Sequence, residues 1–311
     1  MGRCESRICY AAAMRKAIAE RLTVSIVGPG NLGSALALNL SRAGYDIKFL
    51  VARSRTHAPR ETVNLARRVK ANIVALGETP LDSDLVWITV PDDAIADFAT
   101  QLAPTQDWKG TTVFHSSGAL TSDVLTPLHA KGATTASVHP GMTFVRQSLP
   151  RLEGVPFGVE GDAAAVRLAK KIVRDFGGTA HSIKAENKVL YHAFGAFASP
   201  MLIALMTALE QVGKAAGIKP SDLRTMAGPL LRQTLSNYLE HGAAGAFSGP
   251  LVRGDVATIS RHLTALRKTP QAREVYVGLS RAALEFLPVK HRAGLERELN
   301  QIDQGGEAAK G

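Results

Sequence analysis

The chain has 311 residues, of which 45% are hydrophobic and 21% charged, and its 28 glycines follow no collagen-like period. This length exceeds the ~250–300 residues at which one hydrophobic core stops growing, and the composition excludes a fibrous protein and disorder over most of the chain. The net charge of +10 comes from scattered basic residues with few aromatics among them, which disfavours a nucleic-acid partner and favours a phosphorylated ligand.

Residues 1–21 are expected to form a weakly structured N-terminal extension. They contain both cysteines, Cys4 and Cys9, so the body of the chain can hold neither a disulfide framework nor a cysteine-based metal site, and we predict no metal. The extension lacks the long apolar segment of a secretory signal. These features favour a cytoplasmic protein.

Strands alternate with helices from residue 22 to residue 183. The expected strands are 23–27, 47–51, 85–90, 111–115, 135–139, 156–160 and 179–183, and helical patterns cover 32–43 and 163–176. This alternation predicts an α/β fold, a Rossmann-type doubly wound parallel sheet with helices on both faces. Helical patterns alone cover 184–303, which predicts an all-α C-terminal domain, and 304–311 read as a tail.

A glycine-rich turn follows the first strand and opens the first helix. Gly28, Gly30 and Gly33 form G-x-G-x-x-G, with Asn31 and Leu32 between the last two. The first glycine permits a tight turn, the second lets the backbone approach a pyrophosphate, and the third allows close packing of helix on strand. The context predicts a dinucleotide site over a plain glycine-rich turn.

The end of the second strand indicates which dinucleotide binds. An NAD site usually places an acidic residue there, but this chain has Arg53, Ser54 and Arg55. Guanidinium groups match phosphate oxygens, so these residues favour the 2′-phosphate of NADP. The alternative is a solvated basic loop.

Further candidates follow the later strands, where ligands of open parallel sheets bind. Val90 ends the third expected strand, Pro91 follows it, and Ser116 follows the fourth; we assign all three to the cofactor. Ser117 and His139 are expected to contact substrate. A structural role for either of them is the alternative.

Lys188 and His192 lie four residues apart at the start of the helical region, on a polar stripe that continues to Ser199. A lysine buried against apolar surface has a lowered pKa, and could give a proton to a carbonyl oxygen as hydride arrives. We therefore predict Lys188 and His192 as catalytic and Ser199 as a substrate contact. The alternative is a snorkelling lysine and a core histidine.

Two more features lie in the helical region. Arg253, in a turn rich in glycine and proline, could bind a substrate carboxylate. Residues 189–209 carry no charge and are long enough to span a bilayer, but Pro200 interrupts them. We expect a helix buried inside the all-α domain and no membrane span.

On these residues the chain resembles Rossmann-like proteins whose C-terminal half is a domain of unknown function. They belong to the superfamily of 6-phosphogluconate dehydrogenase, β-hydroxyacid dehydrogenase, ketopantoate reductase and pyrroline-5-carboxylate reductase. The resemblance spans about residues 23–285. It rests on the glycine-rich turn, His115-Ser116-Ser117-Gly118-Ala119-Leu120, His139-Pro140, Lys188 to Tyr191-His192, Gly249-Pro250 and Arg253-Gly254-Asp255.

The resemblance implies an NADP-binding domain, a helical domain that forms a homodimer, and a substrate site in the cleft between them. The wider superfamily has Lys-x-x-x-Asn on the helix that begins here at Lys188, with the lysine as acid or base. This chain has His192 in place of that asparagine, which puts the substrate type in doubt. The narrower family often has Asn-Tyr after Ala-Ser, where this chain has Pro200 and Met201, so a kink is expected.

Two classes of function remain open. The first is an NADP-dependent oxidoreductase acting on a small, anionic carbonyl compound, alcohol or imine, with ketopantoate reduction and pyrroline-carboxylate reduction as concrete versions. The second is a non-catalytic NADP-binding sensor or regulatory protein. Whether a substrate drives NADPH oxidation discriminates between them.

Overall fold

The computed structural model describes residues 22–145 and 148–307, and the chain divides into two compact units, Met1–Ala196 and Phe197–Gly311. The extension expected at 1–21, with both cysteines, lies outside the described residues. The last strand ends at Ser182, close to the domain boundary expected at 183. The first unit nevertheless continues to Ala196, because the start of the next helix packs on the sheet.

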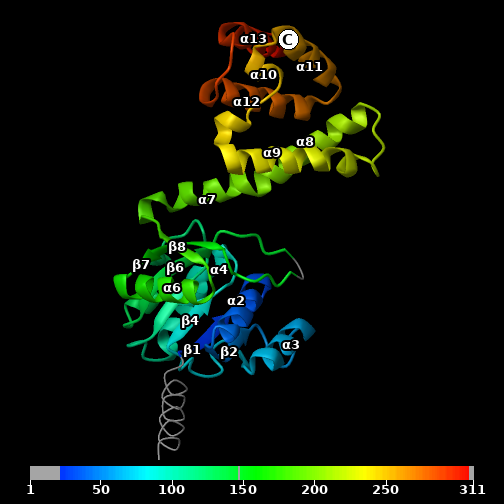
Figure 1. Cartoon of the computed structure of the whole chain (residues 1–311). Helices are drawn as coiled ribbons and strands as arrows, with labels where there is room; N and C mark the ends of the chain where they lie inside the picture. Colours follow the sequence, from blue (N-terminus) through cyan, green and yellow to red (C-terminus); the bar gives the residue numbers. More distant parts are fainter. Residues whose placement is uncertain (1–21, 146–147, 308–311) are drawn as a thin grey trace, which may run out of the picture. The chain divides into compact units, whose positions relative to one another are not determined.

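An eight-stranded sheet forms the centre of the first unit, in the order β3-β2-β1-β4-β5-β6-β7-β8 (Figure 1). Its strands are β1 (Thr23–Val27), β2 (Asp46–Ala52), β3 (Asn72–Ala75), β4 (Leu85–Ile88), β5 (Thr112–His115), β6 (Thr134–Pro140), β7 (Pro156–Gly161) and β8 (Thr179–Ser182). All seven predicted strands are present within two residues at either end. The edge strand β3 was not predicted, and β6 pairs with β7 antiparallel, which interrupts the otherwise parallel sheet.

Helices cover both faces of this sheet, as predicted. They are α2 (Asn31–Arg42), α3 (Arg60–Val69), α4 (Asp92–Leu102), α5 (Thr126–His129) and α6 (Ala163–Asp175), with 3₁₀ turns at Ala103–Thr105, Ser122–Leu125 and Ala185–Asn187. Successive residues of a strand point to opposite faces. Val24 and Ile26 therefore join the core under α2, α3 and α6, whereas Val27 joins the core under α4 and α5.

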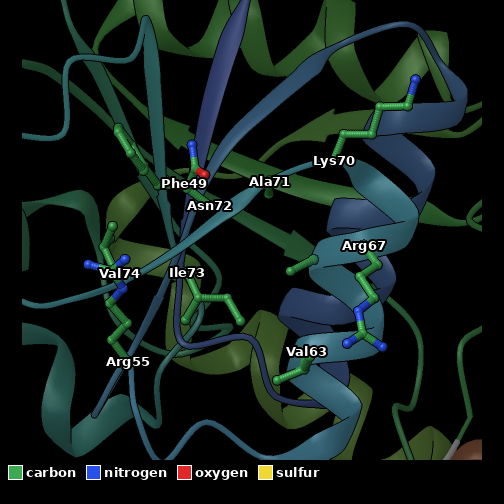
Figure 2. A pocket seen from close by; sticks show the side chains of 10 residues that line it. Phe49, Arg55, Val63, Arg67, Lys70, Ala71, Asn72, Ile73 and Val74 are labelled. Atoms are coloured by element: carbon green, nitrogen blue, oxygen red, sulfur yellow. The ribbon is translucent and has the colours of Figure 1, made fainter.

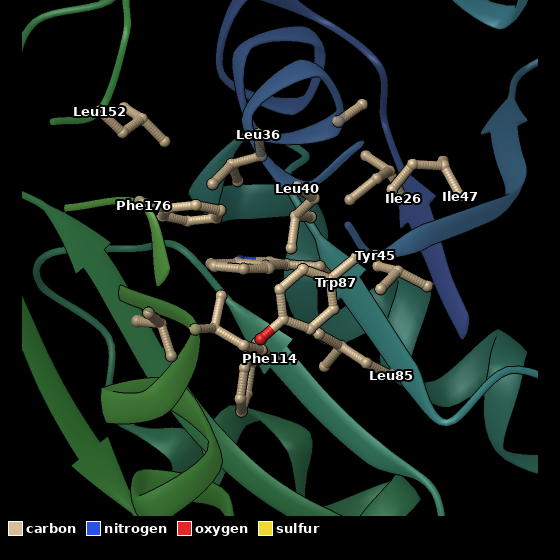
Figure 3. Packing of buried hydrophobic residues seen from close by; sticks show 14 of the residues in the cluster. Ile26, Leu36, Leu40, Tyr45, Ile47, Leu85, Trp87, Phe114, Leu152 and Phe176 are labelled. Carbon is tan, nitrogen blue, oxygen red and sulfur yellow. The ribbon is translucent and has the colours of Figure 1, made fainter. Parts of the chain in front are cut away.

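The core under α2 is built around Trp87. Its ring is fully buried and meets Phe114 edge-on, with 5.2 Å between ring centroids. Figure 3 shows Leu36 and Leu40 of α2 on the other side of the indole. This packing fixes α2 over β1 and β4, and so places the glycine-rich turn at its start.

The second unit is helical, as predicted. Its helices are α8 (Pro200–Ala215), α9 (Leu223–Ala246), α10 (Pro250–Arg253), α11 (Val256–Ala265), α12 (Pro270–Phe286) and α13 (Arg292–Glu307), with a 3₁₀ turn at Leu266–Lys268. A small core joins α11, α12 and α13 through Ile259, Leu263, Val277, Leu284, Leu295 and Leu299. Helix α13 continues past residue 303 to Glu307, and 308–311 lie outside the described residues.

The uncharged run at 189–209 forms two helices, α7 (Lys188–Ala198) and α8. They meet at Ser199, whose φ of −130° and ψ of −83° are not helical, so the break predicted at Pro200 is present. The expected burial is wrong: Ala185–Ala215 is one helical stretch long and apolar enough to cross a membrane, and none of its most apolar window is buried. Helix α8 packs on α12, but large apolar side chains of α7 and of the first turn of α8 remain exposed, namely Leu190, Phe194, Phe197, Met201 and Ile203.

Candidate cofactor and substrate site

The glycine-rich turn connects β1 to α2. Gly28 has a φ of +83°, in the left-handed region that favours glycine, and its N–H donates to the Val51 carbonyl at 3.0 Å. Thr89 Oγ1 donates to the carbonyl oxygens of Val27 (3.0 Å) and Gly28 (2.7 Å), and so joins the turn to the end of β4. The turn is thus held from both neighbouring strands of β1.

The other two glycines of the motif differ in their surroundings. A Cβ on Gly33 would lie 2.5 Å from both the Gly28 carbonyl oxygen and Thr89 Oγ1, so Gly33 permits the close packing of α2 on the turn. A Cβ on Gly30 would meet no atom within 4 Å, and no side chain caps α2 at Gly30. Open space beside uncapped N–H groups at a helix N-terminus suits a phosphate.

Asn31 and Leu32 form the first turn of α2. Asn31 is exposed and its side-chain amide donates to the Phe144 carbonyl at 3.3 Å, and Leu32 packs against the neighbouring core. Their side chains therefore serve the fold, and their contribution to a phosphate site would come from backbone N–H groups.

A cavity of about 670 Å³ lies beside this turn, at the carboxyl ends of β1, β2 and β4. Among the predicted cofactor residues, it is lined by Gly28, Gly30, Arg53, Ser54, Val90 and Pro91. Asp93, in the first turn of α4, also lines it, as do His57, Thr62, Thr89 and Phe98, which were not singled out from the sequence. A cavity of this size is ample for a nucleotide moiety.

Arg55 lies elsewhere. Its guanidinium pairs with Glu78 Oε1 at 3.1 Å and lines a different hollow of about 700 Å³ over β3 and α3. Figure 2 shows Arg55 beside Val74, on the opposite side of this hollow from Arg67. The structure thus separates the two arginines of the predicted phosphate site and leaves Arg53 and Ser54 at the cavity.

The loop after β5 is held by buried polar groups. His115 accepts a hydrogen bond at Nδ1 from the Ser117 backbone N–H (3.1 Å), so its Nε2–H donates to the Thr121 carbonyl (3.1 Å). Burial lowers the pKa of His115 to about 4, so the ring is neutral at pH 7. Ser116 Oγ accepts from the Trp87 indole at 2.8 Å. Ser116 does not line the cavity, and its hydroxyl already serves the core.

Ser117 organises the turn that follows. Its hydroxyl donates to Asp92 Oδ2 at 2.6 Å and accepts from the backbone N–H groups of Ala119 (3.2 Å) and Leu120 (3.0 Å). The Ser117 side chain is therefore fully engaged within the protein. Its role is to connect the loop after β5 to the start of α4.

Lys188 begins α7 and is only 1% exposed. Its amine donates to the Ser117 carbonyl at 3.0 Å and to Ser137 Oγ at 2.6 Å. Burial lowers the pKa of Lys188 to about 8, against the opposing attraction of the Glu160 and Asp92 carboxylates. The amine thus ties α7 to β6 and to the loop after β5, and it titrates near neutral pH.

His139 lies at the end of β6 and is half-buried. Its Nδ1 is 3.1 Å from the Tyr191 hydroxyl, and the two rings are perpendicular with 5.6 Å between centroids. Burial lowers the pKa of His139 to about 4, with further lowering by the charge of Lys188. The neutral ring is thus fixed in place from α7.

Two glycines make room for these rings. A Cβ on Gly118 would lie 2.6 Å from His192 Cδ2 and 2.9 Å from His139 Nε2, and one on Gly158 would lie 2.6 Å from the Tyr191 hydroxyl oxygen. His192 is exposed, and its ring centroid is 6.0 Å from that of His139. The structure thus brings Ser117, His139, Lys188 and His192 together in the first unit.

Ser199 and Arg253 belong to the second unit. Ser199 is the residue at the break between α7 and α8, and its carbonyl accepts from the Ile203 N–H at 3.0 Å. Arg253 is exposed and ends the short helix α10.

Sequence reasoning gave no role to several residues of the cluster. Ser137 lies inside a strand and reads as a strand residue, whereas His115 and Tyr191 were named only as part of the family resemblance. One signal could have found Tyr191: it is three residues after Lys188 and so shares the face of the helix that carries Lys188 and His192. Gly118 was likewise named only within the resemblance, and His57 lies in a loop, where spacing gave no signal.

Two domain families match this chain. A Rossmann-like domain matches residues 11–140, and a domain of unknown function, DUF2520, matches residues 155–283. Together they account for the sheet, α7, α8 and much of the helical region. The chain therefore combines a Rossmann-like domain with a DUF2520 domain.

Individual proteins are more distant. A ketol-acid reductoisomerase (NADP(+)) of Kocuria rhizophila is 28% identical over 181 residues, which are 56% of this chain and 51% of the relative. The chain thus spans about half the length of that curated relative.

Two solved structures share the fold. Protein TM1727 of Thermotoga maritima is 23% identical with a TM-score of 0.68, over 88% of this chain and 99% of its own. A reductive aminase of Aspergillus terreus, solved with NADPH and ethyl-5-oxohexanoate, is 16% identical with a TM-score of 0.62, over 88% of this chain and 98% of its own.

Proposed function

We propose that this chain, a Rossmann-like protein with a DUF2520 domain, is an NADP-dependent oxidoreductase that moves hydride to or from a small carboxylate-bearing carbonyl compound, alcohol or imine. The observation that carries the proposal is the cavity beside the glycine-rich turn, with a buried lysine in the same unit. The name of the Kocuria relative includes NADP(+), and the Aspergillus enzyme was solved with NADPH. Both support NADP as the cofactor.

The residues present fit NADP. The space beside Gly30 and the uncapped N-terminus of α2 would hold the pyrophosphate, and Arg53 with Ser54 would hold the 2′-phosphate. The wall at Val90 and Pro91 is apolar and would pack on the nucleoside. When bound, this cofactor supplies the hydride.

Lys188 is the proposed proton source. In the reducing direction hydride adds to the substrate carbon, the π pair of the double bond moves to oxygen or nitrogen, and that atom takes a proton. A lysine with a pKa of about 8 can release a proton near neutral pH. The buried ammonium also favours a developing alkoxide.

His192 and Arg253 are the proposed substrate-orienting residues. The His192 ring is exposed beside Gly118, where a donor or acceptor on the ring is free to meet a ligand. Arg253 carries an exposed guanidinium, which suits a carboxylate. Their roles belong to the proposal, as does the choice of an anionic substrate.

Coenzyme preference tests the proposed phosphate site. In a fluorescence titration, wild-type protein is expected to bind NADPH at least tenfold more tightly than NADH, about 1.4 kcal/mol. Arg53→Ser is expected to remove most of that preference by weakening NADPH alone, because only NADPH carries the 2′-phosphate.

Arg55→Ser is the matched control. Arg55 pairs with Glu78 outside the cavity, so its loss should leave the preference unchanged. If both variants lose the preference for NADPH to the same extent, the overall positive surface charge explains the preference, and Arg53 does not form a phosphate site. No binding of either coenzyme would contradict the oxidoreductase, whereas NADPH binding without oxidation by any carbonyl or imine would favour a sensor.

We also propose that the exposed face of α7 binds a second copy of this chain. Leu190, Phe194 and Phe197 lie at i, i+4 and i+7 and are 73%, 72% and 76% exposed. They lie on a different side of the helix from Lys188 and His192. An apolar stripe of this kind marks an interaction surface, and it continues into a helix whose most apolar window is wholly unburied.

Sedimentation velocity checks the homodimer. Wild-type protein is expected to sediment as a dimer, and Phe194→Asp is expected to raise the dissociation constant at least about 30-fold, the ~2 kcal/mol typical of a central interface residue. Phe286→Asp, in an equally exposed phenylalanine on α12, is the control and should remain dimeric. If the wild-type protein is a monomer and binds lipid vesicles, the exposed face of α7 binds a membrane and not a second copy of the chain.

A further inference from the structure

A second hollow of the first unit, the edge hollow, has no role in the proposed function. It has a volume of about 700 Å³ and is lined by residues of α3 and β3 together with Phe49 and Arg55. Strand β3 is the last strand of the sheet on this side, so no described strand pairs with its outer edge. Such an edge presents unpaired backbone N–H and C=O groups to its surroundings.

The edge hollow is lined from both faces of the sheet. Ile73 of β3 packs against the core under α2, α3 and α6, whereas Val74 and Phe49 belong to the core of the opposite face. Figure 2 shows the same arrangement, with Arg67 on one side of the hollow and Arg55 beside Val74 on the other. An occupant that follows β3 therefore meets both faces, as the alternating side chains of an added strand do.

Glu78 shows how the outer edge of β3 binds a carboxylate. Its Oε2 accepts from the Ala75 N–H at 2.8 Å, and its Oε1 pairs with the Arg55 guanidinium at 3.1 Å. The Ala75 N–H therefore points away from β2. Backbone N–H groups point alternately to the two sides of a strand, so Ile73 also directs its N–H outward and Val74 directs its N–H towards β2.

The two faces of the edge hollow differ in charge. At the end of α3, Arg67 and Lys70 are exposed, and neither has an ion-pair partner among the described residues. On the other face the lining is Phe49 and Val74, and the only cation drawn there, Arg55, is already in an ion pair. One face thus suits carboxylates and the other suits apolar side chains.

These charges exclude a second copy of the chain as the occupant. Two copies of β3 side by side would bring Arg67 and Lys70 of one copy close to the same cations of the other, and charged side chains on an edge strand oppose such pairing. The net charge of +10 adds to the repulsion. The occupant must carry the opposite charge.

We propose that the edge hollow binds an acidic protein segment in an extended conformation, which adds to β3 as a further strand. Acidic residues of the segment alternate with apolar ones, so that the carboxylates meet Arg67 and Lys70 while the apolar side chains pack on Phe49 and Val74. The Ile73 N–H donates to a carbonyl of the segment. Backbone hydrogen bonds supply affinity and the alternating side chains supply specificity. This site is separate from the cofactor cavity and does not depend on the proposed function.

A pair of peptides tests the pattern of the segment. The probe is a fluorescein-labelled octapeptide of alternating glutamate and valine, and its binding to the whole chain is measured by fluorescence anisotropy. It is expected to bind at least about tenfold more tightly than a peptide of the same composition with glutamates and valines in two separate blocks. Only the alternating peptide matches both faces of the hollow. Equal binding of the two peptides, or no binding of either, would overturn the proposal.

Two neighbouring arginines of α3 provide a variant and its control. Arg67→Glu is expected to weaken binding of the alternating peptide about fivefold or more, because it places a carboxylate where the carboxylates of the peptide bind. Arg68 is also exposed but does not line the edge hollow, so Arg68→Glu changes the net charge equally and should keep the affinity within about twofold of wild type. Equal weakening in both variants would show a general attraction of charges and overturn the site.

Hydrogen exchange followed by NMR tests the strand pairing directly. With the alternating peptide bound, exchange of the outward Ile73 amide is expected to slow about tenfold or more, whereas the Val74 amide, which faces β2, should change little. An Ile73 amide that exchanges as in the free protein would overturn strand addition. An oligothymidylate is the second probe: tighter binding than the peptide, with the same loss in Arg67→Glu, would assign the hollow to nucleic acid and overturn the acidic segment.

Discussion

Gly30→Ala is expected to weaken NADPH binding at least tenfold while leaving thermal unfolding unchanged. The Gly30 backbone is extended, with a φ of −75° and a ψ of −156°, which alanine adopts readily. The added Cβ meets no protein atom within 4 Å, so it fills only the space that a pyrophosphate would approach. The loss should therefore fall on binding alone, at about 1.4 kcal/mol or more.

Gly33→Ala, three residues further on, is expected to lower both stability and binding. Its Cβ would lie 2.5 Å from the Gly28 carbonyl oxygen, which is backbone and cannot move aside without opening the turn. Overpacking of this kind destabilises by about 1–3 kcal/mol. The N-terminus of α2 would shift with the turn, and the phosphate site with it.

Thermal unfolding and NADPH fluorescence titration on the same two variants separate these effects. Equal melting temperatures for Gly30→Ala and wild type, with weaker binding only in the variant, would support a cofactor at the turn. Wild-type affinity in Gly30→Ala would show that no phosphate passes this glycine, and would reduce the motif to a packing device.

The cofactor half of the first unit was predictable because short-range patterns determine it. The β-branched and apolar run at 23–27 indicates a strand, and Gly28, Gly30 and Gly33 directly after it indicate the turn. The edge strand β3 was missed because Asn72–Ala75 is short and follows a helix without a strong break. The antiparallel β6–β7 pair was missed because side chains alternate in the same way along parallel and antiparallel strands, so the pattern does not reveal strand direction.

The substrate side was less predictable because it depends on contacts between residues far apart in the chain. Spacing indicated Lys188 and His192, but not that Ser137, 51 residues earlier, would accept from the Lys188 amine. The same limit applies to Arg55: sequence proximity to Arg53 suggested one phosphate site, whereas Glu78 binds Arg55 outside the cavity. In both cases a partner far away in the sequence determines where the side chain lies, and residue type alone does not reveal that partner.

The free energy of unfolding of the wild-type protein is expected to rise between about pH 8 and pH 10.5. Lys188→Met is expected to remove this rise. The folded pKa of about 8 lies below the ordinary 10.5, because Lys188 is buried and burial disfavours the charged amine. Between these values the unfolded chain binds the proton and the folded chain does not, so the free energy of unfolding rises with pH. Below pH 8 both states are protonated, and burial of the ammonium costs about 3 kcal/mol, the equivalent of the pKa difference.

Methionine fills a similar volume without a charge, so Lys188→Met does not carry this penalty. Ser137 retains a partner in the variant, because its hydroxyl also donates to the Ser117 carbonyl at 3.0 Å. Urea unfolding of both proteins at several pH values from 7 to 10.5 is the measurement. Tyrosines titrate in both and cancel in the difference, which should grow in favour of the wild type by about 3 kcal/mol across the window. Parallel stability curves would mean that the Lys188 amine is solvated in solution and is not the group that titrates near neutral pH.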